Sequence, residues 1–263
     1  MTPISAPPYP VSHGLAKGKS VLVTAAAGVG IGFATARRFA EEGARAVMIS
    51  DIHPRRLEEA AAKLRELTGL EAVYTQICDV TREEQVQALV EAAETHMDGV
   101  DVLINNAGLG GSRYLVDMSD DEWNKVLDVT LTGTFRMTRA MLRRMQPRRA
   151  GAIVNNASVV GWRAQKEQCH YAAAKAGVMA LTRCSALEAA EHGIRINAIA
   201  PSIAMHDFLR KAAPREFLDK LTEKEAFGRA AEVWEMANIM VFLASDYASY
   251  MVGEVMSASS QHP

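Results

Sequence analysis

The stretch that decides the fold runs from residue 20 to residue 39. It reads Ser20-Val-Leu-Val-Thr24, then Ala-Ala-Ala-Gly28-Val-Gly30-Ile-Gly32, then Phe-Ala-Thr-Ala-Arg-Arg-Phe39. An apolar β-branched run that passes through clustered glycines into helical period indicates a strand, a tight turn and a helix. Glycines let a backbone approach a pyrophosphate, and free amides at a helix N-terminus attract anions. The turn therefore predicts a phosphate cradle, although a plain strand-to-helix turn has the same pattern.

The rest of the chain repeats this alternation of short apolar runs and longer helical segments, which is typical of parallel strands joined by crossover helices. We expect seven strands, at Ser20–Thr24, Ala46–Asp51, Ala72–Cys78, Val100–Asn105, Ala152–Asn156, Ile194–Ile199 and Gly253–Ser257. We expect helices around Arg37, over Leu57–Leu67, around Val86–Ala93, and over Asp121–Met145, Tyr171–His192 and Glu232–Ala244, with Ser119 or Asp120 capping the fourth. The sequence predicts an α/β fold with a doubly wound, seven-stranded parallel sheet and helices on both faces.

Composition favours one soluble domain that acts on a small molecule. The 263 residues are 49% hydrophobic and 23% charged, and a formal net charge of −2 offers no basic field for nucleic acid or a membrane surface. No run approaches the roughly 18 apolar residues of a membrane span. The three cysteines have neither the spacing of metal ligands nor that of a redox pair. We therefore expect no metal ion and a cytoplasmic location.

The chain divides into three parts by composition. Residues 1–17 are rich in proline and are expected to form a leader that lies on the surface or is mobile. Residues 18–263 form the domain. Within it, residues 202–229 have no clear strand character and are expected to form a substrate lobe of short helices.

Two strands are predicted to carry polar residues to one edge of the sheet. Val102-Leu-Ile-Asn-Asn-Ala-Gly108 and Ala152-Ile-Val-Asn-Asn-Ala-Ser158 echo each other, each a buried strand that ends in polar and small residues. Adjacent parallel strands would deliver residues 105–108 and Ser158 to the same carboxyl edge, where open α/β sheets bind ligands.

Asp51 points to the kind of dinucleotide. It ends the second strand 19 residues after the last glycine of the turn, close to the ~20-residue offset at which an acid accepts from adenosine ribose hydroxyls. A carboxylate there repels a 2′-phosphate, so NAD is favoured over NADP; Arg55 and Arg56 are expected to lie in a solvated helical turn. Asp79 follows the third strand and would either accept from the adenine amino group or cap the helix beginning near Arg82.

Ser158, Tyr171 and Lys175 have a spacing suited to proton transfer. Tyr171 and Lys175 are four residues apart on one helix face. A phenol of pKa ~10 is a poor base at neutral pH, but an ammonium and an oxidised nicotinamide beside it favour the phenolate. Tyr171 would then remove a proton from an alcohol or return one to a carbonyl.

With these residues the sequence resembles the short-chain dehydrogenase/reductase superfamily in its single-domain, Rossmann-type form. The matches span residues 19–257 and include the glycine turn, Asp51, Asp79, Asn105-Asn-Ala-Gly108, Ser158, Tyr171-Ala-Ala-Ala-Lys175 and Asn197-Ala-Ile-Ala-Pro201. The resemblance implies that Ser158 polarises the substrate oxygen, that Lys175 also holds the nicotinamide ribose, and that the chain forms homotetramers or homodimers. It implies cofactor contacts from Thr24, Gly28, Gly30, Ile31, Gly32, Asp51, Ile52, Asp79, Val80, Asn106, Ala107, Gly108, Tyr171, Lys175, Pro201 and Ile203.

The sequence departs from the family pattern at three places. The glycine turn has one extra residue, and Ala25 replaces its first glycine. Thr130 stands where the family's helix asparagine supports the lysine, which puts the usual proton relay in question. Ser202 and His206 stand at positions of a usual glycine and threonine, and His206 would bind the cofactor carboxamide or pyrophosphate, bind the substrate, or be a surface loop residue.

A closer likeness concerns the substrate. Ala25-Ala-Ala-Gly28, Asn156-Ala-Ser-Val-Val-Gly-Trp-Arg163, Ala200-Pro-Ser-Ile-Ala204 and Ser260-Gln-His-Pro263 resemble actinobacterial dehydrogenases of steroid ring C/D breakdown, which act on a hydroxyl of a methylhydrindanone propanoyl-CoA. Trp162 and Arg163 would line the site beside a bulky ring with an acyl or carboxylate group, or serve packing and a salt bridge. Lobe cations such as Arg210 and Lys211 would meet CoA phosphates or lie on a solvated surface.

Three functions follow from the sequence. The first is an NAD-dependent oxidoreductase that transfers hydride to or from a bulky cyclic or acyl-CoA-linked secondary alcohol or ketone. The second is an NADPH-dependent 3-oxoacyl thioester reductase, which would share the fold and the core motifs. The third is a cofactor-sensing protein without catalysis, which the intact Tyr171 and Lys175 argue against.

Overall fold

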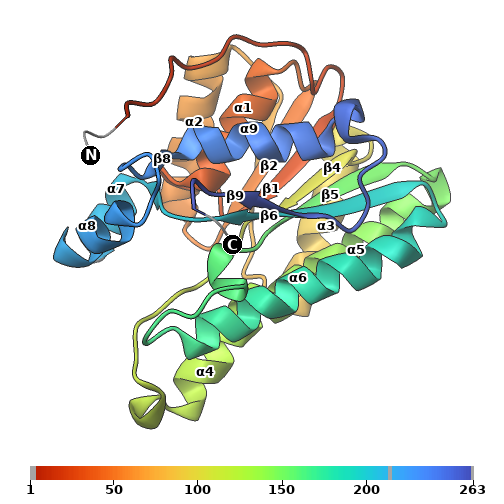
Figure 1. Ribbon diagram of the computed structural model, residues 1–263. Coiled ribbons are helices and arrows are strands. Elements are labelled where there is room, and N and C mark those ends of the chain that lie inside the picture. Colours follow the sequence, from red (N-terminus) through yellow and green to blue (C-terminus); the bar gives the residue numbers. More distant parts are fainter. Residues whose placement is uncertain (1–3, 213–214, 262–263) are drawn as a thin grey trace.

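A single parallel sheet forms the centre of the molecule, whose computed structural model describes residues 4–212 and 215–261. Its strand order is β3-β2-β1-β4-β5-β6-β9 (Figure 1), and every neighbouring pair is parallel. The strands are β1 (Ser20–Thr24), β2 (Ala46–Asp51), β3 (Val73–Ile77), β4 (Val102–Asn105), β5 (Gly151–Asn156), β6 (Ile194–Pro201) and β9 (Val255–Ala258). The predicted sheet is confirmed; β1 and β2 have the predicted bounds, and the other five differ by one or two residues at their ends.

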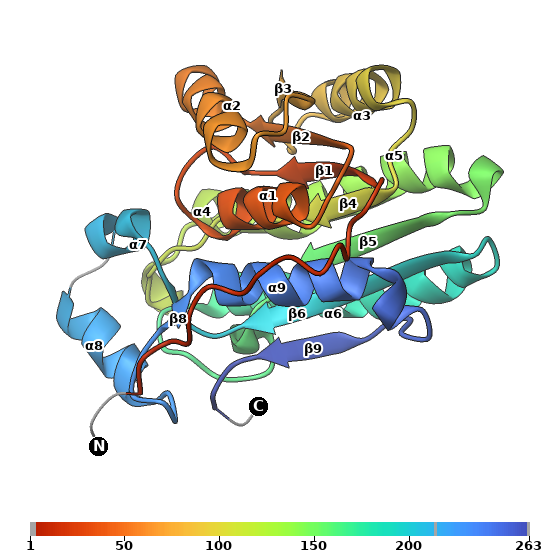
Figure 2. The same ribbon diagram turned by 90° about the horizontal axis from the view of Figure 1, so that it is seen from above.

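Helices cover both faces of this sheet. One face carries α1 (Ile31–Glu41), α2 (Pro54–Thr68) and α9 (Val233–Ala244), and the other carries α3 (Glu83–Met97), α5 (Gly133–Arg148) and α6 (Cys169–Ala190), as Figures 1 and 2 show. Between β4 and α5 lies α4 (Asp120–Leu127), which Ser119 caps by accepting from the Glu122 N–H at 3.2 Å. Short 3₁₀ turns occur at Leu115–Asp117, Val159–Gly161 and Asp246–Ala248.

The predicted helix over Asp121–Met145 is not uniform. A π-helical segment, Asp128–Thr132, joins α4 to α5. The sequence prediction of one regular helix is therefore wrong at this point, because apolar periodicity does not reveal a single wide turn. Such segments occur often at functional sites, and this one carries Thr130.

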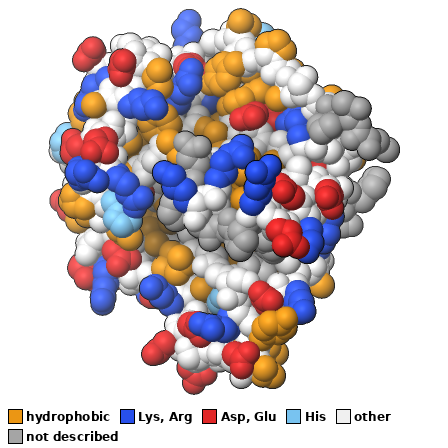
Figure 3. Space-filling model, turned by 90° about the vertical axis from the view of Figure 1, so that its left-hand side faces the viewer, with side chains coloured by type: hydrophobic (Ala, Val, Ile, Leu, Met, Phe, Trp, Pro, Cys, Tyr) orange, Lys and Arg blue, Asp and Glu red, His pale blue; other side chains and the backbone are white. Residues whose placement is uncertain are grey.

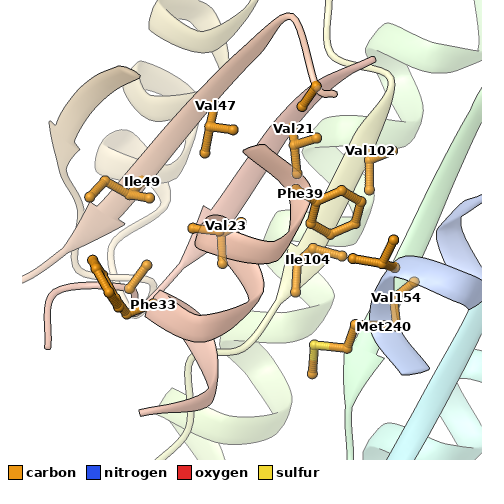
Figure 4. Close-up of a cluster of buried hydrophobic side chains, with 14 of the residues drawn as sticks. Val21, Val23, Phe33, Phe39, Val47, Ile49, Val102, Ile104, Val154 and Met240 are labelled. Carbon is orange, nitrogen blue, oxygen red and sulfur yellow. The ribbon is translucent and has the colours of Figure 1, made fainter. Parts of the chain in front are cut away.

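The core explains why the strands sit as they do. Successive side chains of a strand point to opposite faces, so Val21, Val23, Val47 and Ile49 pack under α1 and α9, where Figure 4 shows them with Phe33, Phe39 and Met240. Their sequence neighbours, including Leu22, Met48 and Leu103, pack against the helices of the other face. Burying one such side chain stabilises the fold by about 1.5–3 kcal/mol, which fixes the register of the sheet and the edge at which its strands end.

The leader lies along the surface of α1. Arg38, which is buried, donates to the backbone carbonyls of Pro10 and Val11 at 2.7 and 2.9 Å and pairs with Glu42. The Tyr9 ring lies edge-on to Trp234 of α9, with 5.4 Å between ring centroids. The leader thus ties α1 to α9 (Figure 2).

The stretch predicted as a lobe contains two short helices, α7 (Asp207–Ala212) and α8 (Arg215–Glu223), as expected. Its base is a two-stranded parallel pair that we did not predict, β7 (Ala204–Met205) with β8 (Ala231–Glu232). In Figure 1 the two helices project from the side at which the strands of the main sheet end.

Candidate functional site

The site lies where the chain reverses its direction of winding. β1 pairs with β2 on one side and with β4 on the other, so the crossovers run in opposite directions from this point and leave a crevice at the carboxyl ends of the two strands. Figure 3 faces this side of the molecule and shows apolar side chains in a hollow flanked by Lys and Arg side chains.

The glycine turn after β1 is closely packed. A Cβ on Gly32 would lie 2.5 Å from both the Ala25 carbonyl oxygen and Asn106 Nδ2, so only glycine fits there. Ala25 adopts φ +51°, the left-handed region that favours glycine. The turn therefore keeps its shape at the position where alanine replaces the family's first glycine.

The start of α1 is arranged for an anion. Gly30 is the N-cap residue, no side chain caps the helix, and the first turn contains neither Asp nor Glu. The amides at this end are left for a ligand or water. Gly28, with φ +159°, has no atom near its would-be Cβ.

Thr24 and Asn106 connect the glycine turn to the loop after β4. The Thr24 hydroxyl accepts from the N–H groups of Asn106 and Ala107 at 3.0 and 3.1 Å, and Asn106 Nδ2 donates to the carbonyls of Thr24 and Ala25. Asn156, at the end of β5, donates to Asn106 Oδ1 at 2.9 Å. Three strand ends are thereby held in one polar network. β4 and β5 are neighbours in the sheet, so the two Asn-Asn-Ala stretches reach the same edge, as predicted.

Asp51 lies at the end of β2 beside this turn. Its carboxylate accepts from the N–H groups of Ala27 and His53 at 3.2 and 3.1 Å. Burial raises its pKa, while the Ala27 hydrogen bond and the charge of Arg56 act in the opposite direction. Arg56 lies in the first turn of α2, as expected, and its charge acts on Asp51.

The remaining residues predicted to contact the cofactor differ in exposure and in local contacts. Asp79 accepts from the N–H and hydroxyl of Thr81 at 2.9 and 2.7 Å, which closes a turn before α3. The alternative that Asp79 caps α3 is wrong, because the N-cap residue is Arg82. Ile31 begins α1, Ile52 is 56% exposed, and the other predicted contacts in this group, Val80, Pro201 and Ile203, are buried.

These features fit a dinucleotide. The glycine turn leaves open space beside Gly28 and free amides at α1, and Asp51 presents a carboxylate next to an exposed apolar side chain. No group of three or more His, Cys, Asp or Glu side chains suited to a metal ion occurs within the described ranges. Within those same ranges, no helix has both the length and the apolar character needed to cross a membrane.

Ser158, Tyr171 and Lys175 meet beside the end of β5. Ser158 follows β5 and caps the turn Val159–Gly161, accepting from the Val160 N–H at 3.3 Å. Tyr171 lies in the first turn of α6, and its hydroxyl is hydrogen-bonded with Ser158. Burial raises the pKa of Tyr171, and the Ser158 hydrogen bond opposes this rise. The predicted lowering of the phenol pKa by an ammonium and an oxidised nicotinamide stays a prediction.

Lys175 lies beneath the phenol. Its Nζ is 5.6 Å from the centroid of the Tyr171 ring and donates to the Asn156 carbonyl. The side chain is buried, and desolvation lowers its pKa from 10.5 to about 8. A Cβ on Gly108 would come within 3.4 Å of Nζ, so the small residue after β4 makes room for the ammonium.

Thr130 lies close by but is engaged elsewhere. Its buried hydroxyl accepts from the Leu109 N–H at 3.0 Å and donates to the Leu109 carbonyl at 3.2 Å. Both Thr130 and Lys175 approach Gly108. The hydroxyl thus holds the loop after β4 on the π-helical segment.

The three residues predicted to bind the substrate have different surroundings. Trp162 is 40% exposed and Arg163 donates to Gln261 near the C-terminus. His206 instead lies over the glycine turn, with its ring edge 3.8 Å from the would-be Cβ of Gly30, and its Nδ1 accepts from the Leu209 N–H at 3.3 Å. Of the three alternatives for His206, this position favours the pyrophosphate.

Sequence reasoning missed Asn156 as part of the site. Its carbonyl accepts from Lys175 and its amide binds Asn106, so it joins the two halves of the site. The repeated Asn-Asn-Ala stretch was the signal that would have identified it.

Known proteins are similar to this chain in sequence and in architecture. The family described as "Enoyl-(Acyl carrier protein) reductase" matches residues 25–260. A curated relative from Mycobacterium tuberculosis, "(5R,7aS)-5-hydroxy-7a-methyl-1-oxo-2,3,5,6,7,7a-hexahydro-1H-indene-carboxyl-CoA reductase", is 61% identical over 98% of both chains. A 3-oxoacyl-(acyl-carrier-protein) reductase from Thermotoga maritima is 37% identical over 91% of this chain and 96% of that enzyme.

Solved structures agree. A short-chain dehydrogenase from Mycobacterium smegmatis superposes with a TM-score of 0.88 at 56% identity, covering 98% of this chain and 99% of the other. The chain is therefore an oxidoreductase that belongs to the short-chain dehydrogenase/reductase family, whose members use a nicotinamide cofactor.

Proposed function

We propose that this enzyme transfers hydride between NAD(H) and a bulky cyclic secondary alcohol or ketone linked to an acyl-CoA. The observation that carries the proposal is the meeting of Ser158, Tyr171 and Lys175 at the sheet edge beside a turn suited to a dinucleotide. A bound nicotinamide would accept or donate the hydride. The residues of the chain orient the substrate oxygen and move its proton.

Tyr171 transfers that proton and Ser158 holds the substrate oxygen. The raised pKa of Tyr171 keeps the phenol protonated at neutral pH, which is the form that donates to a carbonyl as it is reduced. In the reverse direction the charge of Lys175 favours the phenolate. Lys175 thus assists the proton transfer in both directions, and Thr130 positions the neighbouring loop.

Asp51 supports NAD as the cofactor, because its carboxylate would repel a 2′-phosphate and accept from ribose hydroxyls. Thr24, Gly28, Gly30, Gly32, Asn106 and Gly108 form the proposed walls of the cofactor site. NADPH remains the alternative through Arg56, whose charge reaches Asp51. Initial rates with NADH and NADPH decide between them, and a preference for NADPH would contradict this role of Asp51.

The relative from M. tuberculosis supports the substrate class, since its name gives a methylated bicyclic ring joined to CoA. Trp162 would form an aromatic wall for such a ring, with residues 202–229 as the substrate lobe. The T. maritima relative supports a second candidate, a 3-oxoacyl thioester reductase. A comparison of kcat/KM for a bicyclic keto-acyl-CoA and for a linear 3-oxoacyl-CoA distinguishes the two.

Replacing Tyr171 with phenylalanine tests the chemistry. Turnover of the best ketone should fall by at least about 10²-fold, the usual contribution of a positioned proton donor. Tyr250→Phe is the matched control, because Tyr250 is fully exposed. Unchanged turnover in Tyr171→Phe would refute the proposed role.

We also propose a cytoplasmic homotetramer or homodimer. Phe135 of α5 and Leu187 of α6 are 39% and 73% exposed, which supports an apolar contact through these helices. Size-exclusion chromatography with light scattering should give a multiple of the single-chain mass. A species of one chain only would overturn the oligomer.

A further inference from the structure

Two buried nitrogens of Arg163 have no hydrogen-bond partner among the described residues. It follows the turn after Ser158, and its own N–H is held by the Val159 carbonyl at 2.9 Å. Its Nη1 donates to Gln261, whereas Nε and Nη2 have no partner among the residues that the structure describes. Nε–H and Nη2–H form the side of the guanidinium whose two parallel donors match a carboxylate or phosphate.

This arrangement is costly unless something binds there. An unpaired buried donor loses its bonds to water without replacement. Within the described part of the chain, no Asp or Glu oxygen lies within 4.0 Å of Arg163. Arg195 provides the contrast, because its guanidinium donates to four backbone carbonyls and needs no ligand.

The C-terminal segment orients Arg163. Glu225, which is buried in the lobe after α8, accepts from the N–H and hydroxyl of Ser260 at 3.2 and 2.6 Å and from Gln261 Nε2 at 2.6 Å. Since a carboxylate accepts only from the amide nitrogen, Gln261 must turn its oxygen toward Arg163. Glu225 therefore directs Gln261, and Gln261 holds one end of the guanidinium so that the other side stays available.

We propose that the Nε/Nη2 side of Arg163 binds an anionic oxygen pair of the substrate, and that Gln261 and Glu225 are positioning residues for it. The proposal rests on the proposed function, because it assigns the charged part of the same substrate. The oxyanion is a carboxylate on the ring or a phosphate of its carrier. Through Glu225 and Gln261, the lobe helps to hold the guanidinium in place for this ligand.

Four ligands separate these cases. They are a bicyclic keto acid, its methyl ester, its CoA thioester and its N-acetylcysteamine thioester, of which the second and fourth carry no charge. We expect Arg163→Ala to lower kcat/KM for an anionic ligand about 10- to 100-fold more than for its neutral counterpart, the effect of losing bonds to a charged group. A larger loss of kcat/KM for the acid than for its methyl ester identifies a carboxylate. A larger loss for the CoA thioester than for the N-acetylcysteamine thioester identifies a phosphate.

Two further variants keep the test independent of folding. Arg163→Lys retains the positive charge without the two parallel donors. This variant should lose most of the preference for anionic over neutral ligands. Gln261→Ala should raise KM for the anionic ligand while leaving kcat near that of the wild type. Thermal shift by each ligand with the cofactor present provides a binding readout, and Lys63→Ala, on the exposed side of α2, is the control.

Equal losses for charged and neutral ligands, or no loss in any Arg163 variant, would overturn the assignment. If the wild type turns over none of the four ligands, the proposed function itself fails, and the inference fails with it. Failure of the proposed function is distinguishable from failure of the Arg163 assignment, because only the former is seen with the wild-type enzyme.

Discussion

Replacing Lys175 with methionine should make the protein more stable at neutral pH and remove its activity. Burial lowers the pKa of Lys175 from 10.5 to about 8. At about 1.4 kcal/mol per tenfold change in proton affinity, keeping this group charged costs the folded state about 3 kcal/mol. The hydrogen bond from Nζ to the Asn156 carbonyl contributes about 1 kcal/mol in the other direction. Methionine has a similar length, so the expected net gain is about 2 kcal/mol.

The gain should depend on pH in a defined direction. Between about pH 8 and 10.5, Lys175 is neutral in the folded protein and protonated in the unfolded chain. The unfolded state then binds more protons, so the wild type becomes more stable as the pH rises through this range. The variant has no such group, and its advantage should be largest below pH 8 and shrink toward pH 10.

Urea unfolding of the ligand-free protein at pH 7 and pH 9.5 measures both effects. For a chain of this size, a gain of about 2 kcal/mol in the free energy of unfolding also corresponds to a rise of about 4–8 °C in Tm. Lys63→Met is the matched control, because Lys63 is exposed on α2 and its replacement should change stability little. A Lys175→Met protein that is less stable than the wild type at pH 7, with a difference that does not vary with pH, would refute the reasoning.

Three further predictions concern the cofactor end. Gly32→Ala should lower the free energy of unfolding, measured by urea titration, by about 1–3 kcal/mol, because the new Cβ would lie 2.5 Å from a backbone oxygen. In Gly30→Ala the new Cβ would lie 3.8 Å from the His206 ring, so this variant should lose less than half as much stability in the same titration. Thr130→Val should cost about 1–3 kcal/mol by leaving the Leu109 N–H and carbonyl unpaired, and recovery by Thr130→Ser in thermal unfolding would assign the loss to the hydroxyl. His206→Ala should weaken ADP-ribose binding about tenfold in calorimetry and leave AMP binding unchanged; equal affinity for ADP-ribose would exclude the pyrophosphate contact.

The sheet was predictable because burial on both faces leaves a direct signal. β1 and β2 each contain a run of consecutive apolar residues between turn signals, and their predicted bounds are confirmed. The pair β7 and β8 was not predictable, since two-residue strands have no periodicity. The π-helical segment was missed for a related reason, because one wide turn changes the apolar spacing by a single residue.

The candidate site likewise has features that the sequence predicts and features that it does not. Ser158, Tyr171 and Lys175 come together because a strand end and one helix carry them, and short-range spacing determines that geometry. The contact of Arg163 with Gln261, 98 residues away in the sequence, depends on how the C-terminal segment folds back. The rise that burial causes in the pKa of Tyr171 was not predictable, because desolvation depends on all the surrounding atoms, which no local motif specifies.

The wide turn at Asp128–Thr132 has a consequence for the two helices that it joins. Each residue of a regular α-helix turns the chain by about 100°, so one extra residue in a turn rotates everything beyond it relative to what precedes it. α4 can therefore face α6 while α5 faces α3 and β4. Deleting one residue here would restore a regular helix and turn the apolar side of α5 away from the sheet, so this segment should tolerate substitutions far better than changes of length.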